Sequence, residues 1–410
     1  MTAFRLGINY WPRRSAMYMW QRFDLGELRE DFARLHGLGL HTVRFFLGWE
    51  DFQPQPDEID KTALLHLVEL MDSLADAKLE GMPTFFSGHM SGVNFLPEWT
   101  LDRSTSNGRF RTFSNGKDVP YGIGDFYTGD LLLAQQRQVR AVGERLCGHP
   151  SLYAWDLGNE FSNLREPESP QDAALWSATL TAELLDAAEK PVTGGTHGED
   201  ITRDRHLRLS SVCAPYDFAT MHGYSVYSAF SRGRLDEEVV PFLYDIARGC
   251  SHKPVLFSEF GNPTCPPGTV SPFDRVPLPG EAPLASSSQT PSNAAGFACL
   301  REDEMATYGY GVLDRLQRRG ALGGLWWCWA DYAQELAQTP PFDRAVHELH
   351  FGIVRNDGSE KPIADALARF ANEDRSVERA GLPIVEEASY YAGLPGNVDA
   401  LYERYVANHA

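Results

Sequence analysis

The sequence SLYAWDLGNEF occupies residues 151–161. Its first half alternates small or apolar residues with aromatic ones, as a buried strand does, and the pattern breaks at Gly158 before Asn159 and Glu160. A similar pattern returns at residues 253–261, KPVLFSEFG, where an apolar run ends in Glu259 and a glycine. The two stretches therefore predict two buried strands, each of which carries a carboxyl group at its end.

These strands belong to a repeated unit in which a strand precedes a helix. The expected strands lie at residues 5–10, 42–47, 82–87, within 151–163, and at 191–194, 218–222, 254–258 and 323–328, and the expected helices at 25–36, 61–80, 130–147, 171–189, 235–249, 301–319 and 361–370. Eight such strands predict a single (β/α)8 TIM barrel over residues 1–372, with residues 373–410 as an extension packed on its outside. Long loops are expected at 88–128 and 262–298, and the second shows no periodicity.

Composition narrows the classes of partner. The 410 residues carry a formal net charge of −19 and no Lys/Arg-rich run, which argues against nucleic acid or a membrane surface and favours a neutral substrate. No signal peptide or membrane span is visible, so a cytoplasmic protein is expected, or a secreted one if a leader precedes it. The six cysteines form no CxxC pair, which favours reduced thiols over disulfides or zinc ligands. The sequence is compatible with a homo-oligomer and does not decide the oligomeric state.

The site of such a barrel lies where the strands end, at their carboxyl termini. Polar and aromatic residues gather there: Tyr10, Trp11, Arg44, His89, Asn159, Glu160, His222, Tyr224, Glu259, Trp327 and Trp329. Each has an ordinary explanation when taken alone, since Arg44 could form a structural ion pair and a single histidine or tryptophan often fills the core. Alternation along the strand points Trp326 away from the barrel axis. As a set, however, these residues predict a functional site.

The ordered set resembles clan A of the glycoside hydrolases, and most closely family 5, over about residues 5–370. The resemblance is carried by the strand-two arginine, the Asn-Glu pair after strand four, the His-x-Tyr after strand six, the glutamate of Ser-Glu-Phe-Gly and the strand-eight tryptophan, which here are Arg44, Asn159, Glu160, His222, Tyr224, Glu259 and Trp327. The phrase GWEDFQP at residues 48–54 also resembles that family's second loop.

The resemblance implies a retaining glycosidase in which Glu160 is the acid/base and Glu259 the nucleophile. Two carboxyl groups about 5–5.5 Å apart suit that mechanism, and they need opposite protonation states. Arg44 and the hydroxyl of Tyr224 are suited to keep Glu259 ionised. The remaining roles expected are binding and orientation of the sugar: Asn159 to its 2-hydroxyl, His89 to another hydroxyl, His222 to Glu160, Trp327 as a stacking face, and Tyr10, Trp11 and Trp329 nearby. No metal or cofactor is expected.

The sequence says least about the substrate, because no linear motif reports which sugar the site accepts. The general likeness is to mannan-active members of the family, and an exo-acting β-mannosidase on short β-mannosides is the expected activity, because the two long loops would close the site into a pocket. The alternatives are an endo-β-1,4-mannanase and a β-glucosidase or exo-glucanase. A non-catalytic carbohydrate-binding barrel is the alternative from another class, and the presence of both glutamates argues against it. His347 and His350 suggest no complete metal site.

Overall fold

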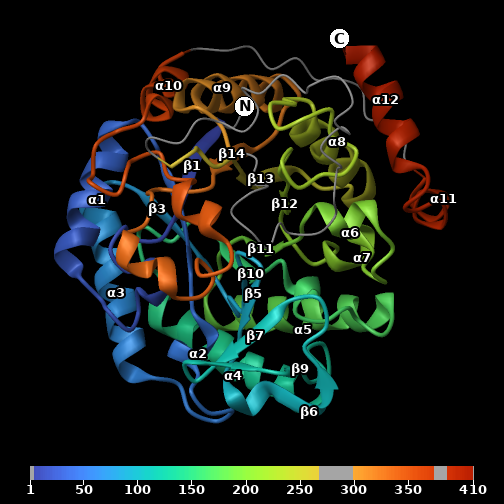
Figure 1. Ribbon diagram of the computed structural model, residues 1–410. Helices are drawn as coiled ribbons and strands as arrows, with labels where there is room; N and C mark the ends of the chain where they lie inside the picture. The colour runs from blue at the N-terminus through green and yellow to red at the C-terminus, as the bar shows by residue number, and fades with distance from the viewer. Residues whose placement is uncertain (1–3, 267–298, 374–385, 410) are drawn as a thin grey trace.

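Eight parallel strands form the centre of the computed structural model, which describes residues 4–266, 299–373 and 386–409 (Figure 1). They are β1 (Arg5–Tyr10), β2 (Thr42–Phe46), β3 (Glu80–Thr84), β10 (Trp155–Asn159), β11 (Val192–Gly195), β12 (Ala219–His222), β13 (Val255–Phe260) and β14 (Gly323–Trp326). Their order is β11-β10-β3-β2-β1-β14-β13-β12. The outer strands β11 and β12 meet through a parallel bridge between His197 and His222, which completes the barrel. The predicted (β/α)8 fold is confirmed.

Helices surround the strands (Figure 1). The long ones are α1 (Leu25–Gly37), α3 (Lys61–Asp76), α4 (Gly129–Leu146), α5 (Pro170–Ala187), α8 (Val239–Ser251), α9 (Glu302–Arg318) and α10 (Pro362–Ala371). The short ones are η1 (Ala16–Tyr18), α2 (Trp49–Phe52), η2 (Glu98–Thr100), η3 (Phe161–Asn163), α6 (Gly198–Thr202), α7 (Leu209–Val212), η4 (Gln334–Gln338) and η5 (Val346–His350). Only the short α6 and α7 separate β11 from β12.

The local sequence explains where helices begin and end. Asp24 caps α1 by accepting hydrogen bonds from the backbone N–H groups of Gly26 and Glu27. Helix α3 was expected to continue to residue 80, but it ends at Asp76 because Lys78 adopts a positive φ of 60° and turns the chain into β3. The apolar faces of these helices pack on the outside of the barrel, whereas a separate cluster that includes Met82, Leu256 and Leu325 comes from three strands of the barrel itself.

The loop expected at residues 88–128 is more regular than predicted. It contains a four-stranded sheet of β4 (His89–Met90), β5 (Val93–Phe95), β7 (Arg111–Ser114) and β8 (Lys117–Val119), and a pair formed by β6 (Leu101–Ser106) and β9 (Tyr121–Ile123). Asn115 and Gly116 both have positive φ and join β7 to β8, as the Asn-Gly pair does in tight hairpins. This turn signal was present in the sequence, but residues 88–128 were expected only as a long loop and their strands were not predicted.

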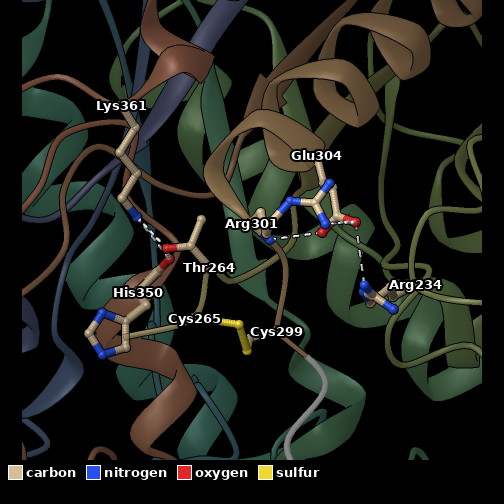
Figure 2. The surroundings of a disulfide bond; sticks show 8 residues. All are labelled: Arg234, Thr264, Cys265, Cys299, Arg301, Glu304, His350 and Lys361. Atoms are coloured by element: carbon tan, nitrogen blue, oxygen red, sulfur yellow. Dashed lines mark hydrogen bonds and ion pairs between the residues drawn. A yellow bond between two sulfur atoms is a disulfide. The ribbon is translucent and has the colours of Figure 1, made fainter. Parts of the chain in front are cut away.

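The expectation that all cysteines are reduced thiols is also wrong. Cys265 and Cys299 form a disulfide, and their Cα atoms lie 4.8 Å apart (Figure 2). The two cysteines are 34 residues apart in sequence, and a backbone bridge between their neighbours Thr264 and Leu300 brings them together. A search for CxxC spacing cannot find such a long-range pair. Of the loop expected at residues 262–298, the part from 267 onward lies outside the described residues.

Helices α11 (Glu387–Ala392) and α12 (Val398–His409) lie at the edge of the barrel beside α6 and α8 (Figure 1). The Tyr390 hydroxyl donates to the carbonyl of Ile201, and the Tyr402 ring packs on that of Phe242, with 5.0 Å between the ring centroids. Within the described ranges, no helix combines the length and the apolar character that crossing a membrane requires.

Candidate active site

Arg44 organises the polar interior of the barrel. Its fully buried guanidinium donates through Nε to Asp156 (2.7 Å), through Nη1 to Glu259 (2.5 Å) and Asn9 (3.0 Å), and through Nη2 to Asn159 (2.9 Å). Burial alone would lower the pKa of Arg44, but the charges of Asp156 and Glu259 raise it. The arginine therefore stays charged and fixes groups from three other strands, so the structural ion pair and the functional role coexist in one residue.

Glu259 lies near the end of β13, where the register with β14 and β12 shifts. One carboxyl oxygen accepts from Arg44, and the other accepts from the Tyr224 hydroxyl at 2.7 Å. Burial, and next the charge of Glu259, raise the pKa of Tyr224 well above its usual value, so the phenol remains a donor. Both Glu259 oxygens are thus stabilised by donors, as a carboxylate nucleophile requires.

Glu160 follows β10 in the left-handed backbone region, with φ of 45°. Its carboxyl accepts a hydrogen bond from Asn163 Nδ2 (2.9 Å) and lies 3.2 Å from His222 Nδ1. The Glu160 side chain is 17% exposed, against 5% for that of Glu259, which leaves the first open to solvent and to a leaving group. One carboxyl oxygen of each glutamate and a ring nitrogen of His222 lie within 4.8 Å of one another.

This trio has the geometry of a metal site, but its surroundings disfavour a cation. Arg44 already donates to Glu259 at 2.5 Å, so an ion bound by the trio would lie beside a permanent positive charge. Among the residues that the structure describes, the trio is the one group of three with this spacing, and the His347–His350 pair gains no third ligand.

Three buried histidines face the acid/base candidate. His89 Nε2 and His197 Nδ1 lie 3.8 Å and 4.0 Å from Glu160 Oε2. Burial lowers the pKa of His89 and of His197 to about 4 and that of His222 to about 3. All three are therefore neutral near pH 7 and serve as hydrogen-bonding groups rather than as cations. Asn159 donates to the carbonyl of His89 at 2.9 Å, which uses one of its two amide hydrogens.

The aromatic residues divide into two groups. Trp327 contacts Phe46 edge-to-face at 5.8 Å, and Trp11 stacks on the same ring at 5.1 Å. The Arg44 guanidinium also contacts this ring, 4.7 Å from its centroid, so Phe46 links both tryptophans to the polar interior of the barrel. As alternation predicts, Trp326 points elsewhere, toward Gly309 of α9.

Tyr10 and Trp329 are not brought to the carboxyl pair, which corrects the expectation that they bind substrate. The Tyr10 hydroxyl donates to Asp31 of α1 at 2.9 Å. The guanidinium of Arg34, on the same helix, lies over the Trp329 ring, 5.2 Å from the ring centroid. Tyr10 follows the inward-pointing Asn9 in β1, so the alternation of a strand turns it toward the helices.

Other residues of the site were missed by the sequence reading. Arg205 donates to the Asn163 oxygen at 2.8 Å and so sets the orientation of the amide that reaches Glu160. Asp156, which Arg44 holds, could have been found as a charged residue within a buried strand. Arg205 lies outside the barrel strands and carried no such signal. The same holds for Glu348 of η5, whose carboxyl accepts a hydrogen bond from Ser91 after β4. Asp331 forms an ion pair with Lys361 at 2.7 Å and is structural.

The fold and the site together show a (β/α)8 barrel with two glutamates that converge at the ends of its fourth and seventh strands, which is the arrangement that the resemblance to clan A implies. No known protein-family profile matches this sequence, and a comparison with curated proteins finds no match either. Solved structures do match, and they confirm the likeness to family 5.

An exo-β-1,4-mannosidase, Op5Man5 from Opitutaceae bacterium strain TAV5, matches with a TM-score of 0.69 and 25% identity over 90% of this chain. The match covers 59% of the Opitutaceae protein. A GH5_18 protein from Streptomyces cattleya, solved with GlcNAc, has a TM-score of 0.75 and 20% identity, over 98% of this chain and 90% of its own. A GH5_18 protein from Bifidobacterium longum, solved as a glutamate-to-alanine variant with Manβ1-4GlcNAc, has a TM-score of 0.69 and 17% identity, over 90% of this chain and 78% of its own.

Proposed function

We propose that this protein is a retaining glycoside hydrolase that acts on β-mannosides and releases single mannose units from short chains. The observation that carries the proposal is the convergence of Glu160 and Glu259, which each place a carboxyl oxygen within 4.8 Å of the other. Their surroundings differ: both oxygens of Glu259 accept from Arg44 or Tyr224, whereas the Glu160 side chain is more exposed. That separation matches a double displacement better than the wider gap that admits a water molecule for inversion.

The chemistry follows from the two environments. An oxygen of Glu259 attacks the anomeric carbon while the bond to the leaving oxygen breaks, and Glu160 gives that oxygen its proton. A water molecule then loses a proton to Glu160 and adds to the anomeric carbon, which releases Glu259 and restores the starting state. Asn159 has an amide hydrogen left for the 2-hydroxyl of the sugar, and Trp327 offers a flat face beside the pair.

Mannose is proposed from the neighbours. The Opitutaceae protein is an exo-β-1,4-mannosidase, and two GH5_18 variants, from Streptomyces cattleya and Bifidobacterium longum, were solved with Manβ1-4GlcNAc. Exo action is supported by the sheets within residues 88–128, which place His89 and Ser91 at the rim of the site and can limit access from that side.

A second candidate, an endo-β-1,4-mannanase, is favoured by one observation. A cavity of about 360 Å³ adjoins Trp11 and is lined by residues of the segments after β1, β2, β3 and β14, among them Tyr18, Glu50 and Met90. Space of this size at the face of the barrel where the strands end can hold a further sugar ring.

Product analysis separates the two candidates. The protein is assayed first on 4-nitrophenyl β-glycosides of mannose, glucose, galactose, xylose and fucose, and the mannoside should be the best substrate. Proton NMR of the first product should show the β-anomer, since inversion would give the α-anomer. Mannotriose should yield mannose as the early product with little action on polymeric mannan. A rapid fall in mannan viscosity would instead establish the endo-mannanase, and no turnover of any glycoside would refute both.

A further inference from the structure

A third glutamate closes one side of the candidate site. Glu348 belongs to η5, in the segment between β14 and α10, and its side chain is 8% exposed. Its carboxyl accepts a hydrogen bond from the hydroxyl of Ser91 (2.8 Å) and another from that of Tyr227 (3.0 Å). Ser91 follows β4 and Tyr227 follows β12, so this one carboxyl joins three segments that come from different parts of the barrel rim.

The carboxyl of Glu348 adjoins the groups assigned to the sugar. It interacts with the indole of Trp327, and the Tyr227 ring packs on that of Tyr224 with 5.4 Å between centroids. Tyr224 in turn donates to Glu259 at 2.7 Å. Glu348 therefore borders the space between the Trp327 face and the nucleophile, on the side of Tyr224.

Within the described part of the chain, Glu348 has hydrogen-bond donors but no cationic partner. No arginine or lysine among the described residues lies within ion-pair distance, and its basic neighbour is His347, at 3.5 Å. Burial lowers the pKa of His347 to about 4, so this ring is neutral near pH 7. Burial also raises the pKa of Glu348 to about 7. A buried carboxyl without a cation destabilises a fold, whereas glutamine would satisfy the same hydroxyls at lower cost.

The segment that carries Glu348 is held rigidly. The carbonyl of His350 accepts hydrogen bonds from Lys361 Nζ (3.2 Å) and from the backbone N–H of Thr264 (3.0 Å), the residue beside the disulfide (Figure 2). On the other side, His347 Nε2 lies 2.8 Å from the Tyr227 hydroxyl. An anchored, uncompensated acid at a site rim has the properties of a group built to meet a ligand rather than to support the core.

We infer that Glu348 recognises a free hydroxyl of the terminal sugar, at a ring position other than C1 or C2, and so restricts the site to chain ends. The inference rests on the proposed function. A carboxyl group offers about four lone-pair positions, and Ser91, Tyr227 and Trp327 occupy three, which leaves one for a sugar hydroxyl. C1 faces the catalytic pair, and the 2-hydroxyl falls to Asn159. A hydroxyl that already carries another sugar has no proton to donate, so an internal unit of a polymer would be rejected.

The test compares Glu348→Gln with Glu335→Gln, an exposed glutamate in η4 of the same segment that serves as the matched control. Both variants and the wild type are assayed on the best 4-nitrophenyl glycoside and on its 3-, 4- and 6-deoxy analogues. We expect Glu348→Gln to lose about 10- to 100-fold in kcat/KM on the parent compound, in line with one hydrogen bond to a charged group. On the analogue that lacks the recognised hydroxyl, the same variant should match the wild type within about threefold.

The outcomes separate the two proposals. A wild type that turns over none of the glycosides refutes the proposed function. With an active wild type, an equal loss on the parent compound and on all three analogues would show that Glu348 only shapes the loop, and an unchanged Glu348→Gln would show that it is idle. Either result overturns the inference about Glu348 alone. Thermal unfolding followed by circular dichroism verifies that each variant is folded.

Discussion

Replacing Asn163 by alanine should impair acid catalysis specifically. The Asn163 amide donates to Glu160 Oε2 at 2.9 Å, and Arg205 fixes the orientation of that amide from its other end. Without the Asn163 amide, His222 is the one side chain within hydrogen-bond distance of Glu160 among the described residues, since His89 and His197 lie 3.8 Å and 4.0 Å away. The Glu160 carboxyl can then turn away from the leaving oxygen. The variant should still fold, because Arg205 retains its ion pair with Glu166 at 2.9 Å.

The size of the effect follows from the single bond removed. A hydrogen bond to a charged group contributes about 1.5–3 kcal/mol, and each 1.4 kcal/mol corresponds to about a tenfold change in rate. We therefore expect kcat/KM for a natural disaccharide to fall by about 10- to 100-fold. The leaving group of a 2,4-dinitrophenyl glycoside, 2,4-dinitrophenolate, is a stable anion that needs no protonation, so kcat/KM for this substrate should change by less than about threefold.

The assay is a comparison of the two leaving groups in the wild type, in Asn163→Ala and in Asn372→Ala. Asn372 lies at the end of α10, far along the chain from the carboxyl pair, and provides the matched control, which should behave as the wild type with both substrates. If Asn163→Ala lost the same factor on the disaccharide and on the dinitrophenyl glycoside, the amide would act on binding or on the nucleophile, and the assignment to acid catalysis would be refuted.

Three further predictions concern the carboxyl pair, the disulfide and a buried histidine. Glu160→Ala and Glu259→Ala should each lose several orders of magnitude in rate. Azide should then give a β-glycosyl azide with the first variant and an α-azide with the second, and near-native turnover of either would exclude the assignment. Cys299→Ser should lower the free energy of unfolding by about 4 kcal/mol in urea titrations, since the bond closes a 34-residue loop, and unchanged stability would contradict this. Burial lowers the pKa of His197 from 6.5 to about 4. Between these two pH values the unfolded chain binds a proton at this histidine and the folded protein does not. The free energy of unfolding therefore falls as the pH is lowered from 6.5 toward 4. Between pH 7 and pH 5 this loss is about 2 kcal/mol, and His197→Asn should show a correspondingly flatter decline in the same titration.

The sequence was sufficient to predict the features that follow from strand periodicity. Glu160 and Glu259 could be placed because parallel strands bring their carboxyl ends to one edge, and Arg44 stood out as a charge within an apolar strand. Tyr10 was placed wrongly because it was taken as a residue of the strand end, although alternation turns it outward. Glu348 was not predicted at all, since contacts distant in sequence position it.

The closure of the barrel has a consequence for how the chain is made. Strand β1 pairs with β2 on one side and with β14 on the other, where Arg5 faces Gly323, roughly 300 residues later. At about 5–20 residues per second, a ribosome needs roughly 15–60 s to supply that partner, and until then one edge of β1 is open to pairing with other chains. Asn9 of the same strand bonds both to Arg44 and to the carbonyls of Ser258 and Trp326. The anchorage of the carboxyl pair is therefore completed by the same late event that closes the barrel, and a nascent chain that stops short of β14 cannot assemble it.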